Sequence, residues 1–494
     1  MGSRRALAFM TVAALAFAGC GGDDGGGGDS TETPSTETPS TDAPATDAPA
    51  TDAPATDAPA TDAPATNAPE GDADGVLNVP EEYPTIQAAV DASEPHDLVL
   101  IAAGTYNEAV NVETNELTIR GVDRNTVILD GEFELDNGIR VLGANGVAIE
   151  NMTAINYTFN GFFWTGVEGY RGSYLTAWRN GDYGIYAFDS VKGQLEYSYA
   201  AGSPDAGFYI GQCYPCDAVI DTVVSEHNGL GYSGTNSGGN LTIVRSTFNN
   251  NRAGVVPNSG SYELCYPERE TTIVGNVVYS NNQADTPAID VALLAMGNGI
   301  LSAGGVANVI ERNLVYDHDK TGIGLVPFLE EDPSDTEPTE EDWAVPCDET
   351  KDDVPGGVTG AIIWNSKNNV VRDNVLEDNR AADIAVGVAE GDGSGLGNCF
   401  AGNTFTLSAP TDLEALAPCD GAGAGDWTAN ALNVVDWLVE AETRPPSVPF
   451  EEAELPERPT LDNMPDAATA PARPATDVPF AVDLDAIAVP VKPS

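Results

Sequence analysis

The chain has 494 residues and a formal net charge of −56, because 77 Asp and Glu residues outnumber 21 Lys and Arg residues. Such a negative field repels nucleic acids and anionic membranes, and it repels polyanions where no cation mediates. The charge therefore argues against nucleic acid as a partner and is typical of a solvated acidic surface. Length alone does not divide the chain into domains, since solenoids run long as one unit.

Residues 1–20 carry the pattern of an export signal. Two arginines precede an apolar run over 6–17, which is too short to span a bilayer, and Ala18 and Gly19 follow it. Cys20 comes directly after this small pair, an arrangement that resembles the signal of bacterial lipoproteins. The resemblance implies an exported protein, lipid-anchored at Cys20 on the outer face of the cell membrane, that touches the membrane through the lipid only. The alternative is an ordinary secretory signal with an incidental cysteine.

Residues 21–75 are of low complexity. The unit Thr-Asp-Ala-Pro-Ala occurs five times over 41–65, after two Thr-Glu-Thr-Pro-Ser units. Proline at every fifth position and the lack of bulky apolar residues preclude a packed core. We therefore predict a disordered, extended tether that holds the folded part away from the membrane.

The folded domain is predicted to begin at Val76. Residues 83–92 are typical of a short helix with a proline near its start, and 98–102 are typical of a strand. The motif Gly-Thr-Tyr-Asn-Glu follows at 104–108. Together these segments resemble the opening of pectin-lyase-like right-handed β-helix proteins, in which a short helix caps the first coil. The resemblance covers 76–405 as an architecture and is weak for activity.

A glycine followed by an apolar residue recurs with a period of 23 or 24 residues. The series is Gly138, Gly161, Gly184, Gly207, Gly231 and Gly254, and a further pair 23 apart is Gly299 and Gly322. Three short strands and three turns fit in such a unit, and none holds a run long enough for an amphipathic helix. We predict an all-β fold over 76–417, a right-handed parallel β-helix of at least eight coils with a short N-terminal capping helix.

This period assigns side chains to the two faces of one sheet. The residue after each glycine is apolar and is predicted to face the core, in a column that contains Ile139, Phe162, Ile185 and Phe208. Side chains alternate along a strand, so the next residue points outward. The outward column reads Arg140, Phe163, Tyr186 and Tyr209, with Phe188 further along the Tyr186 strand. Rings about 4.8 Å apart could stack on sugars, with the arginine binding carboxylates or hydroxyls. The alternative is an inserted loop that packs over the rings.

No enzyme motif accompanies this face. The chain lacks the Asp-Phe-x-Phe-Gly and Gly-Arg-Pro-Trp segments of pectin methylesterases, the His-Gly and Arg-x-Lys segments of polygalacturonases and the Asp-Pro-His segment of alginate epimerases. The remaining catalytic candidates are weak. Asp189 and Asp205 lie near the column, and His227 and His318 each precede a coil glycine by four residues, beside acids. A histidine flanked by acids could act as a general base, but a polar turn residue is the commoner explanation.

Six cysteines follow Cys20, and an even number in an exported chain predicts three disulfides. They are Cys213, Cys216, Cys265, Cys347, Cys399 and Cys419. The first two have the spacing of a redox motif, but no thioredoxin-like pattern surrounds them. We therefore interpret the six cysteines as structural disulfides that hold loops in place. The sequence does not decide their pairing.

The segment 328–357 interrupts the repeat with twelve carboxylates between Glu330 and Asp353. It lacks the EF-hand pattern, so a solvated acidic loop is predicted and calcium stays open as a ligand. We predict no metal site and no other cofactor, because three histidines and five methionines are a poor set of ligands for copper.

The repeat resumes after this loop and ends near residue 417. The segments 308–313 and 369–374 each begin and end in asparagine, which predicts stacked asparagine ladders on the coil turns. Residues 418–494 are predicted to form a C-terminal cap, with a helix over 430–443, and a proline-rich tail. The sequence leaves open whether this tail wraps the outside of the coils or is loose.

Three functional hypotheses follow. The first is a cell-surface lipoprotein that binds or processes an extracellular polysaccharide or cell-wall glycan; an enzyme of this kind would be a lyase, hydrolase or epimerase. The second is a non-catalytic adhesin or scaffold, whose rigid body is the function. The third is a metal-handling periplasmic β-helix protein, for which the sequence offers few ligands.

Overall fold

The computed structural model describes residues 75–331, 333–335, 345–350, 360–389, 391–434, 436–437, 440 and 447–493. The export signal, Cys20 and the tether predicted up to residue 75 lie outside these residues, apart from Gly75, as does most of the acidic loop. Within the described part of the chain no helix is long and apolar enough to cross a membrane.

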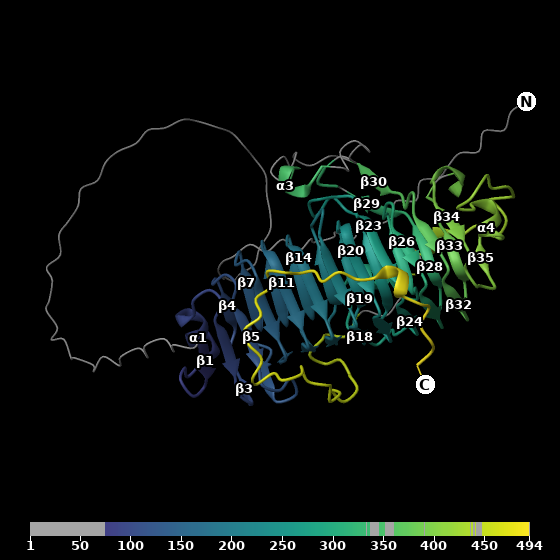
Figure 1. Ribbon diagram of the computed structural model, residues 1–494. Helices are drawn as coiled ribbons and strands as arrows, with labels where there is room; N and C mark the ends of the chain where they lie inside the picture. Colours follow the sequence, from purple (N-terminus) through teal and green to yellow (C-terminus); the bar gives the residue numbers. More distant parts are fainter. Residues whose placement is uncertain are drawn as a thin grey trace, which may run out of the picture. The chain divides into compact units, whose positions relative to one another are not determined.

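The chain passes in turn through three sheets, in which all neighbouring strands are parallel (Figure 1). Sheet A consists, in spatial order, of β1 (Val76–Val79), β2 (Leu98–Ile101), β5 (Thr118–Gly121), β8 (Val147–Glu150), β11 (Glu168–Ser173), β14 (Val191–Glu196), β17 (Ala218–Asp221), β20 (Gly238–Val244), β23 (Arg269–Val274), β26 (Val309–Glu311), β31 (Val370–Arg372) and β34 (Cys399–Ala401). Sheet B consists of β3 (Gly104–Tyr106), β6 (Val127–Asp130), β9 (Thr153–Ile155), β12 (Thr176–Trp178), β15 (Tyr199–Ala201), β18 (Val224–Glu226), β21 (Thr247–Asn249), β24 (Val277–Tyr279), β27 (Leu314–Tyr316) and β32 (Val375–Glu377). Sheet C consists of β4 (Val110–Val112), β7 (Ile139–Leu142), β10 (Phe162–Thr165), β13 (Ile185–Phe188), β16 (Ala206–Gly211), β19 (Leu230–Thr235), β22 (Ala253–Asn258), β25 (Ile300–Ala303), β28 (Thr321–Val326), β33 (Ala382–Val386) and β35 (Ser408–Ala409).

The pairing register in sheet C is the one that the glycine period predicts. Ile139, Phe162, Ile185 and Phe208 lie opposite one another on β7, β10, β13 and β16. All four side chains are fully buried. The apolar side chains of successive coils therefore stack inside the solenoid, and burial of each contributes about 1.5–3 kcal/mol. The prediction of at least eight coils is confirmed.

The predicted capping helix is α1 (Ile86–Ala92). Its N-cap is Thr85, whose side chain accepts a hydrogen bond from the amide of Ala88. The carboxylate of Glu108 accepts bonds from the first two helical amides, those of Ile86 and Gln87, at 3.1 Å each. The last residue of the Gly-Thr-Tyr-Asn-Glu motif thus holds the helix on the first coil.

Asparagine ladders run along the turns, as predicted from the two equivalent segments. The amide nitrogen of Asn308 donates to Oδ1 of Asn369 at 2.8 Å, and Nδ2 of Asn313 donates to Oδ1 of Asn374 at 3.0 Å. These side chains are buried, and each satisfies main-chain groups of a turn that would otherwise lack partners.

The six cysteines in the described part of the chain form three disulfides, as predicted. They join Cys213 to Cys216, Cys265 to Cys347 and Cys399 to Cys419. The second bond ties the loop 259–268, between β22 and β23, to α3 (Cys347–Thr350).

Other elements cover the later coils of sheet C. The helix α2 (Asp290–Ala295) buries Ala292 and Ala295 in an apolar cluster with β16, β19, β22, β25 and β28. An antiparallel pair, β29 (Phe328–Glu331) and β30 (Ala361–Trp364), lies on either side of most of the acidic loop in the sequence, and Phe328 packs against the same cluster. Leu432 of the predicted cap packs on the last coils of sheet C.

Residues 447–493, called the strap below, return along the outside of the coils (Figure 1). The carbonyl of Ala453 accepts a bond from Arg179 at 2.8 Å, the amide of Met464 donates to Asn151 at 2.8 Å, and Lys492 forms an ion pair with Glu377 at 3.1 Å. The strap therefore first approaches the N-terminal coils and then turns back across sheet A. Of the two arrangements that the sequence leaves open, the wrapped one is observed.

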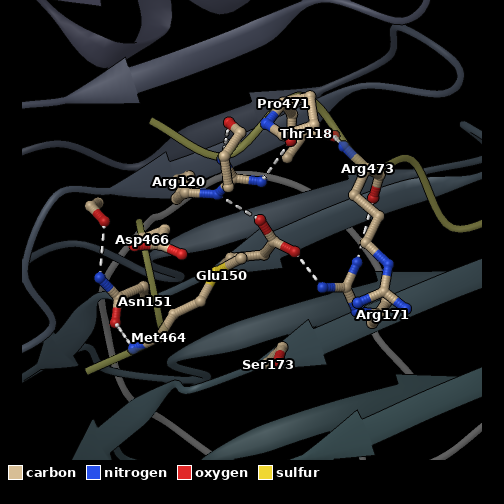
Figure 2. Close-up of polar contacts among 12 residues, drawn as sticks. Thr118, Arg120, Glu150, Asn151, Arg171, Ser173, Met464, Asp466, Pro471 and Arg473 are labelled. Atoms are coloured by element: carbon tan, nitrogen blue, oxygen red, sulfur yellow. Dashed lines mark hydrogen bonds and ion pairs between the residues drawn. The ribbon is translucent and has the colours of Figure 1, made fainter. Parts of the chain in front are cut away.

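A buried ion network lies between the strap and sheet A (Figure 2). Nε of Arg120 is 2.6 Å from one carboxylate oxygen of Glu150, and Arg171 binds the other oxygen. Nη1 and Nη2 of Arg120 donate to the strap carbonyls of Ala470 and Pro471, at 2.6 and 3.0 Å. These bonds offset the cost of removing the charges from water, which is high for any buried ion that lacks partners.

Candidate functional site

The outward column of sheet C has the predicted register. Arg140, Phe163, Tyr186 and Tyr209 lie opposite one another on β7, β10, β13 and β16. The ring centroids of Phe163 and Tyr186 are 4.8 Å apart, as are those of Tyr186 and Tyr209. Phe188 stacks beside Tyr186 with centroids 5.9 Å apart. The strand spacing of the sheet thus sets the spacing of the rings.

The rings differ in exposure. Phe163, Tyr186 and Phe188 are half-buried, whereas Tyr209 is fully buried. The hydroxyl of Tyr209 donates to Oε2 of Glu263 at 2.5 Å, so the 259–268 loop covers this end of the column. The alternative in which an inserted loop packs over the rings therefore holds for Tyr209, while three rings keep part of their surface in solvent.

The 259–268 loop is held firmly against sheet C. The amide of Leu264 donates to the side chain of Gln212 at 2.9 Å, and Asn236 donates to the carbonyls of Gly260 and Glu263 at 2.6 and 2.7 Å. The disulfide of Cys265 fixes the same loop from its other side. Glu263 is thereby placed beside the aromatic column by an element outside the repeat.

Tyr183 adds a ring to the column from the turn that precedes β13. Its ring stacks on Tyr186 with centroids 4.3 Å apart and planes inclined by 14°. Its centroid is 5.0 Å from that of Tyr209. The alternation of side chains along strands does not predict that Tyr183 joins the column, because Tyr183 lies in a turn. The only signal for it is the concentration of aromatic residues over 157–232.

Three carboxyl groups surround these tyrosines, namely Asp182, Asp205 and Glu263. Burial raises the pKa of Asp182 to about 7 and the pKa of Glu263 to about 8. Burial, together with the charges of Asp182 and Glu263, also raises the pKa of Asp205 well above its usual range, although a hydrogen bond from Tyr183 opposes this shift. These carboxyl groups can therefore carry protons near neutral pH, as a general acid must.

Of the four catalytic candidates, Asp205 lies beside the tyrosines of the aromatic column, where Tyr183 donates a hydrogen bond to it. It directly precedes β16 and is 7 % exposed. Asp189 follows β13 in a turn with a left-handed φ of 47°. His227 lies half-buried in another turn, and burial lowers its pKa.

His318 is a rung of an asparagine ladder. Its Nε2 is 3.1 Å from Nδ2 of Asn281, and its Nδ1 is 2.8 Å from Oδ1 of Asn379. The asparagine amide donates to Nε2, so Nδ1 carries the proton and donates in turn. Burial lowers the pKa of His318 to about 4, so the ring is neutral at physiological pH. These contacts belong to a polar turn residue and not to a general base at the aromatic column.

Arg140 lies at the N-terminal end of the column. Its Nε donates to Asn111 at 3.0 Å, and its Nη1 is 3.7 Å from Asp136. Both side chains of the ion pair are partly exposed, so this contact contributes little to stability. The guanidinium is thus available at the edge of the face that carries Phe163.

The described residues contain no group of three or more histidines, cysteines, aspartates or glutamates that could hold a metal ion. The acidic loop, for which calcium stays open, falls mostly outside those residues. A hollow lined by residues 405–408, 411–412 and 414–415 lies at β35, the opposite end of sheet C from the aromatic column. It contains none of the predicted site residues.

Comparison with known proteins agrees with the observed architecture. Residues 160–327 match the family model described as a right-handed β-helix region. The fold is a right-handed parallel β-helix. No curated protein matches the chain in sequence.

Several solved β-helix structures resemble the chain at low sequence identity. The A-module of the mannuronan C-5 epimerase AlgE4 of Azotobacter vinelandii is 13 % identical with a TM-score of 0.42, covering 68 % of this chain and 93 % of its own. The periplasmic alginate epimerase AlgG is 13 % identical with a TM-score of 0.39, covering 68 % and 84 %. The pectate lyase Pel9A is 13 % identical with a TM-score of 0.36, covering 81 % and 89 %. At this identity and overlap, the likenesses assign no activity to the present chain.

Proposed function

We propose that this protein is an exported lipoprotein that binds an extracellular polysaccharide on the outward face of sheet C. The observation that carries the proposal is the row of half-buried, mutually stacked rings of Phe163, Tyr183, Tyr186 and Phe188. Rows of this kind offer flat apolar surfaces to the C–H faces of sugars. Spacing of 4.8 Å between coils favours an extended chain that lies along the solenoid and contacts one ring per coil.

The charge of the protein favours a neutral polysaccharide. Residues after 75 include 64 acidic and 19 basic side chains, so a polyanion would meet a repulsive field at low salt. Arg140 is the one cation of the column, at its edge. The carboxyl groups of Asp205 and Glu263 supply hydrogen bonds to sugar hydroxyls and, in a processing enzyme, the proton for the leaving oxygen.

Binding is tested with a polysaccharide array and the full-length protein. Stacking of each ring contributes about 1 kcal/mol, so the double variant Phe163→Ala/Tyr186→Ala should bind more than tenfold more weakly. The matched control is Tyr279→Ala, which removes a half-buried ring stacked on Tyr316 on the outside of sheet B. Equal losses in the two variants would refute the assignment to sheet C, and no binding by the wild-type protein would favour the scaffold hypothesis.

The anchor is tested separately by Cys20→Ala. This change removes the only proposed lipid attachment, so the protein should move from the membrane fraction to the soluble fraction of exported protein. Retention of the variant on membranes would contradict lipid anchoring without affecting the polysaccharide proposal.

A further inference from the structure

The strap contains a copy of the tether sequence. Residues 474–479 read Pro-Ala-Thr-Asp-Val-Pro, and Pro-Ala-Thr-Asp-Ala-Pro occurs four times over 44–64. The two sequences differ only where Val478 stands in place of alanine. One segment of the chain with this sequence is therefore seen bound to sheet A, and further segments with almost the same sequence occur elsewhere in the chain.

Sheet A holds this part of the strap mainly through main-chain atoms (Figure 2). The amide of Arg473 donates to Thr118 at 2.8 Å, and its carbonyl accepts a bond from Arg171 at 3.1 Å. The amide of Ala475 donates to the carbonyl of Gly146 at 2.8 Å. Every residue except proline offers the same groups, so a tether repeat, which has alanine at the position of Arg473, could form these bonds too.

The side chains of the segment that face the sheet are small and apolar. Ala475 is fully buried against Ala148, and Val478 is 8 % exposed, whereas Thr476 and Asp477 point to solvent. A tether repeat has alanine at both buried positions and the same threonine and aspartate at the exposed ones. It therefore matches the surface except for the smaller apolar contact in place of Val478.

Two glycines, Gly146 in the turn before β8 and Gly169 in β11, leave the space that the segment fills. A Cβ on Gly169 would lie 2.4 Å from the carbonyl oxygen of Ala475, and one on Gly146 would lie 3.4 Å from Thr476. Both glycines have a positive φ, which glycine adopts without strain. The surface of β8 and β11 is thus shaped to admit a peptide main chain.

We propose that this surface is a docking site for Pro-Ala-Thr-Asp-Ala-Pro segments, and that a tether repeat of a second copy of the chain occupies it when the strap is displaced. The strap keeps the site filled within one molecule. The tether repeats have the sequence that fits the observed contacts, and in the proposed exchange they come from a neighbouring molecule. Such an exchange would join copies of the protein to one another.

The fit of the repeat sequence is tested by Val478→Ala, which makes residues 474–479 identical to a tether repeat. The measurement is hydrogen exchange of the Ala475 amide in the full-length protein. We expect exchange within tenfold of the wild-type rate, because the main-chain bonds and the buried Ala475 are kept. The reference for a displaced strap is Ala475→Arg, since arginine does not fit between the strap and Ala148. Exchange in Val478→Ala as fast as in that reference would overturn the proposal.

Docking from another molecule is tested with a fluorescent peptide of residues 43–59 and the full-length protein. Its fluorescence anisotropy should show saturable binding to Ala475→Arg and at least tenfold weaker binding to the wild type, whose site is filled. A peptide with arginine for the alanine after each proline is the control and should not bind. Absence of binding to Ala475→Arg, or equal binding to both proteins, would contradict the docking site. If Ala475→Arg fails to fold, exchange of the Ala475 amide in Val478→Ala at the rate of an unprotected amide still overturns the proposal.

Light scattering then identifies the source of the bound repeat. Full-length Ala475→Arg should form oligomers whose mass rises with protein concentration and falls when excess peptide is added. A variant that stays monomeric throughout would overturn the assignment to a second copy.

Discussion

Sheets A and C present two kinds of outward face. On sheet A, the charged side chains of Arg120, Glu150 and Arg171 are buried under the strap and bonded to one another and to its carbonyls. On sheet C, the rings of Phe163 and Tyr186 stack on each other and remain half-exposed. The buried charges of sheet A need polar partners, which the strap supplies, whereas partial burial of stacked rings on sheet C leaves surface for a ligand. One solenoid thus uses one face for its own chain and another for a partner.

The largest loss of stability is expected from a substitution at Glu150, in the buried ion network of sheet A. Glu150→Ala leaves the buried guanidinium of Arg120 without a carboxylate and leaves Arg171 with Glu196 as its remaining carboxylate partner. It should therefore lower the free energy of unfolding by about 3–5 kcal/mol. Chemical denaturation measures this loss, with Glu150→Gln as the milder control because its amide oxygen still accepts a bond. Under conditions where Glu150→Ala stays folded, polysaccharide binding on sheet C should be unchanged. A loss of stability no greater than that of an exposed substitution would contradict the account of sheet A.

A side chain that belongs to neither face gives a second, smaller effect. His318→Ala removes one rung of the buried ladder, so Asn281 and Asn379 each lose one hydrogen bond. Thermal or chemical unfolding should show a cost of about 1–3 kcal/mol. His318→Asn should cost less, because asparagine continues the ladder, and His227→Ala, in a half-buried turn, should change stability by about 0.5 kcal/mol or less. Equal costs at the two histidines would refute the distinction between them.

The smallest effect concerns the protons beside the aromatic column. The pKa of Glu263 is raised to about 8 in the folded protein, so between about pH 4.5 and 8 the folded state holds a proton that the unfolded state has lost. Stability should consequently fall as the pH rises through this window and level off above it.

Glu263→Gln should flatten this dependence by removing the titrating group. Melting temperatures of both proteins at pH 5 and pH 8 test the prediction, and the difference between the proteins cancels the contributions of other groups. A few degrees of additional loss is expected in the wild type. The opposite sign, with the wild type gaining stability toward pH 8 relative to the variant, would mean that Glu263 is ionised in the fold.

The sequence predicted the coils well, because their information is local and repeated. The glycine period placed Ile139 and Phe162 in the core and Phe163 and Tyr186 opposite each other on the outside, since strand alternation and parallel pairing leave no other register. The asparagine ladders and the capping helix followed from the same kind of pattern.

The sequence did not predict what covers the coils. Tyr209 was assigned correctly to the outward column, but its burial depends on Glu263, which arrives in a loop without periodicity. Tyr183 joins the site from a turn, and the strap reaches Arg120 across 350 residues of sequence. Such contacts depend on where a segment without a repeat packs against the coils. The residue spacing within that segment does not predict where it packs.

The course of the strap also bears on how the molecule responds to force. Its contacts extend from Arg120 on β5 to Glu377 on β32, so it ties early coils to late ones. A solenoid under tension at its N-terminus would otherwise unravel one coil at a time, breaking few hydrogen bonds at each step. With the strap bound, peeling the coil of Arg120 also requires rupture of the strap contacts, which act in parallel. The strap would therefore work as a longitudinal clamp that raises the force at which unravelling begins.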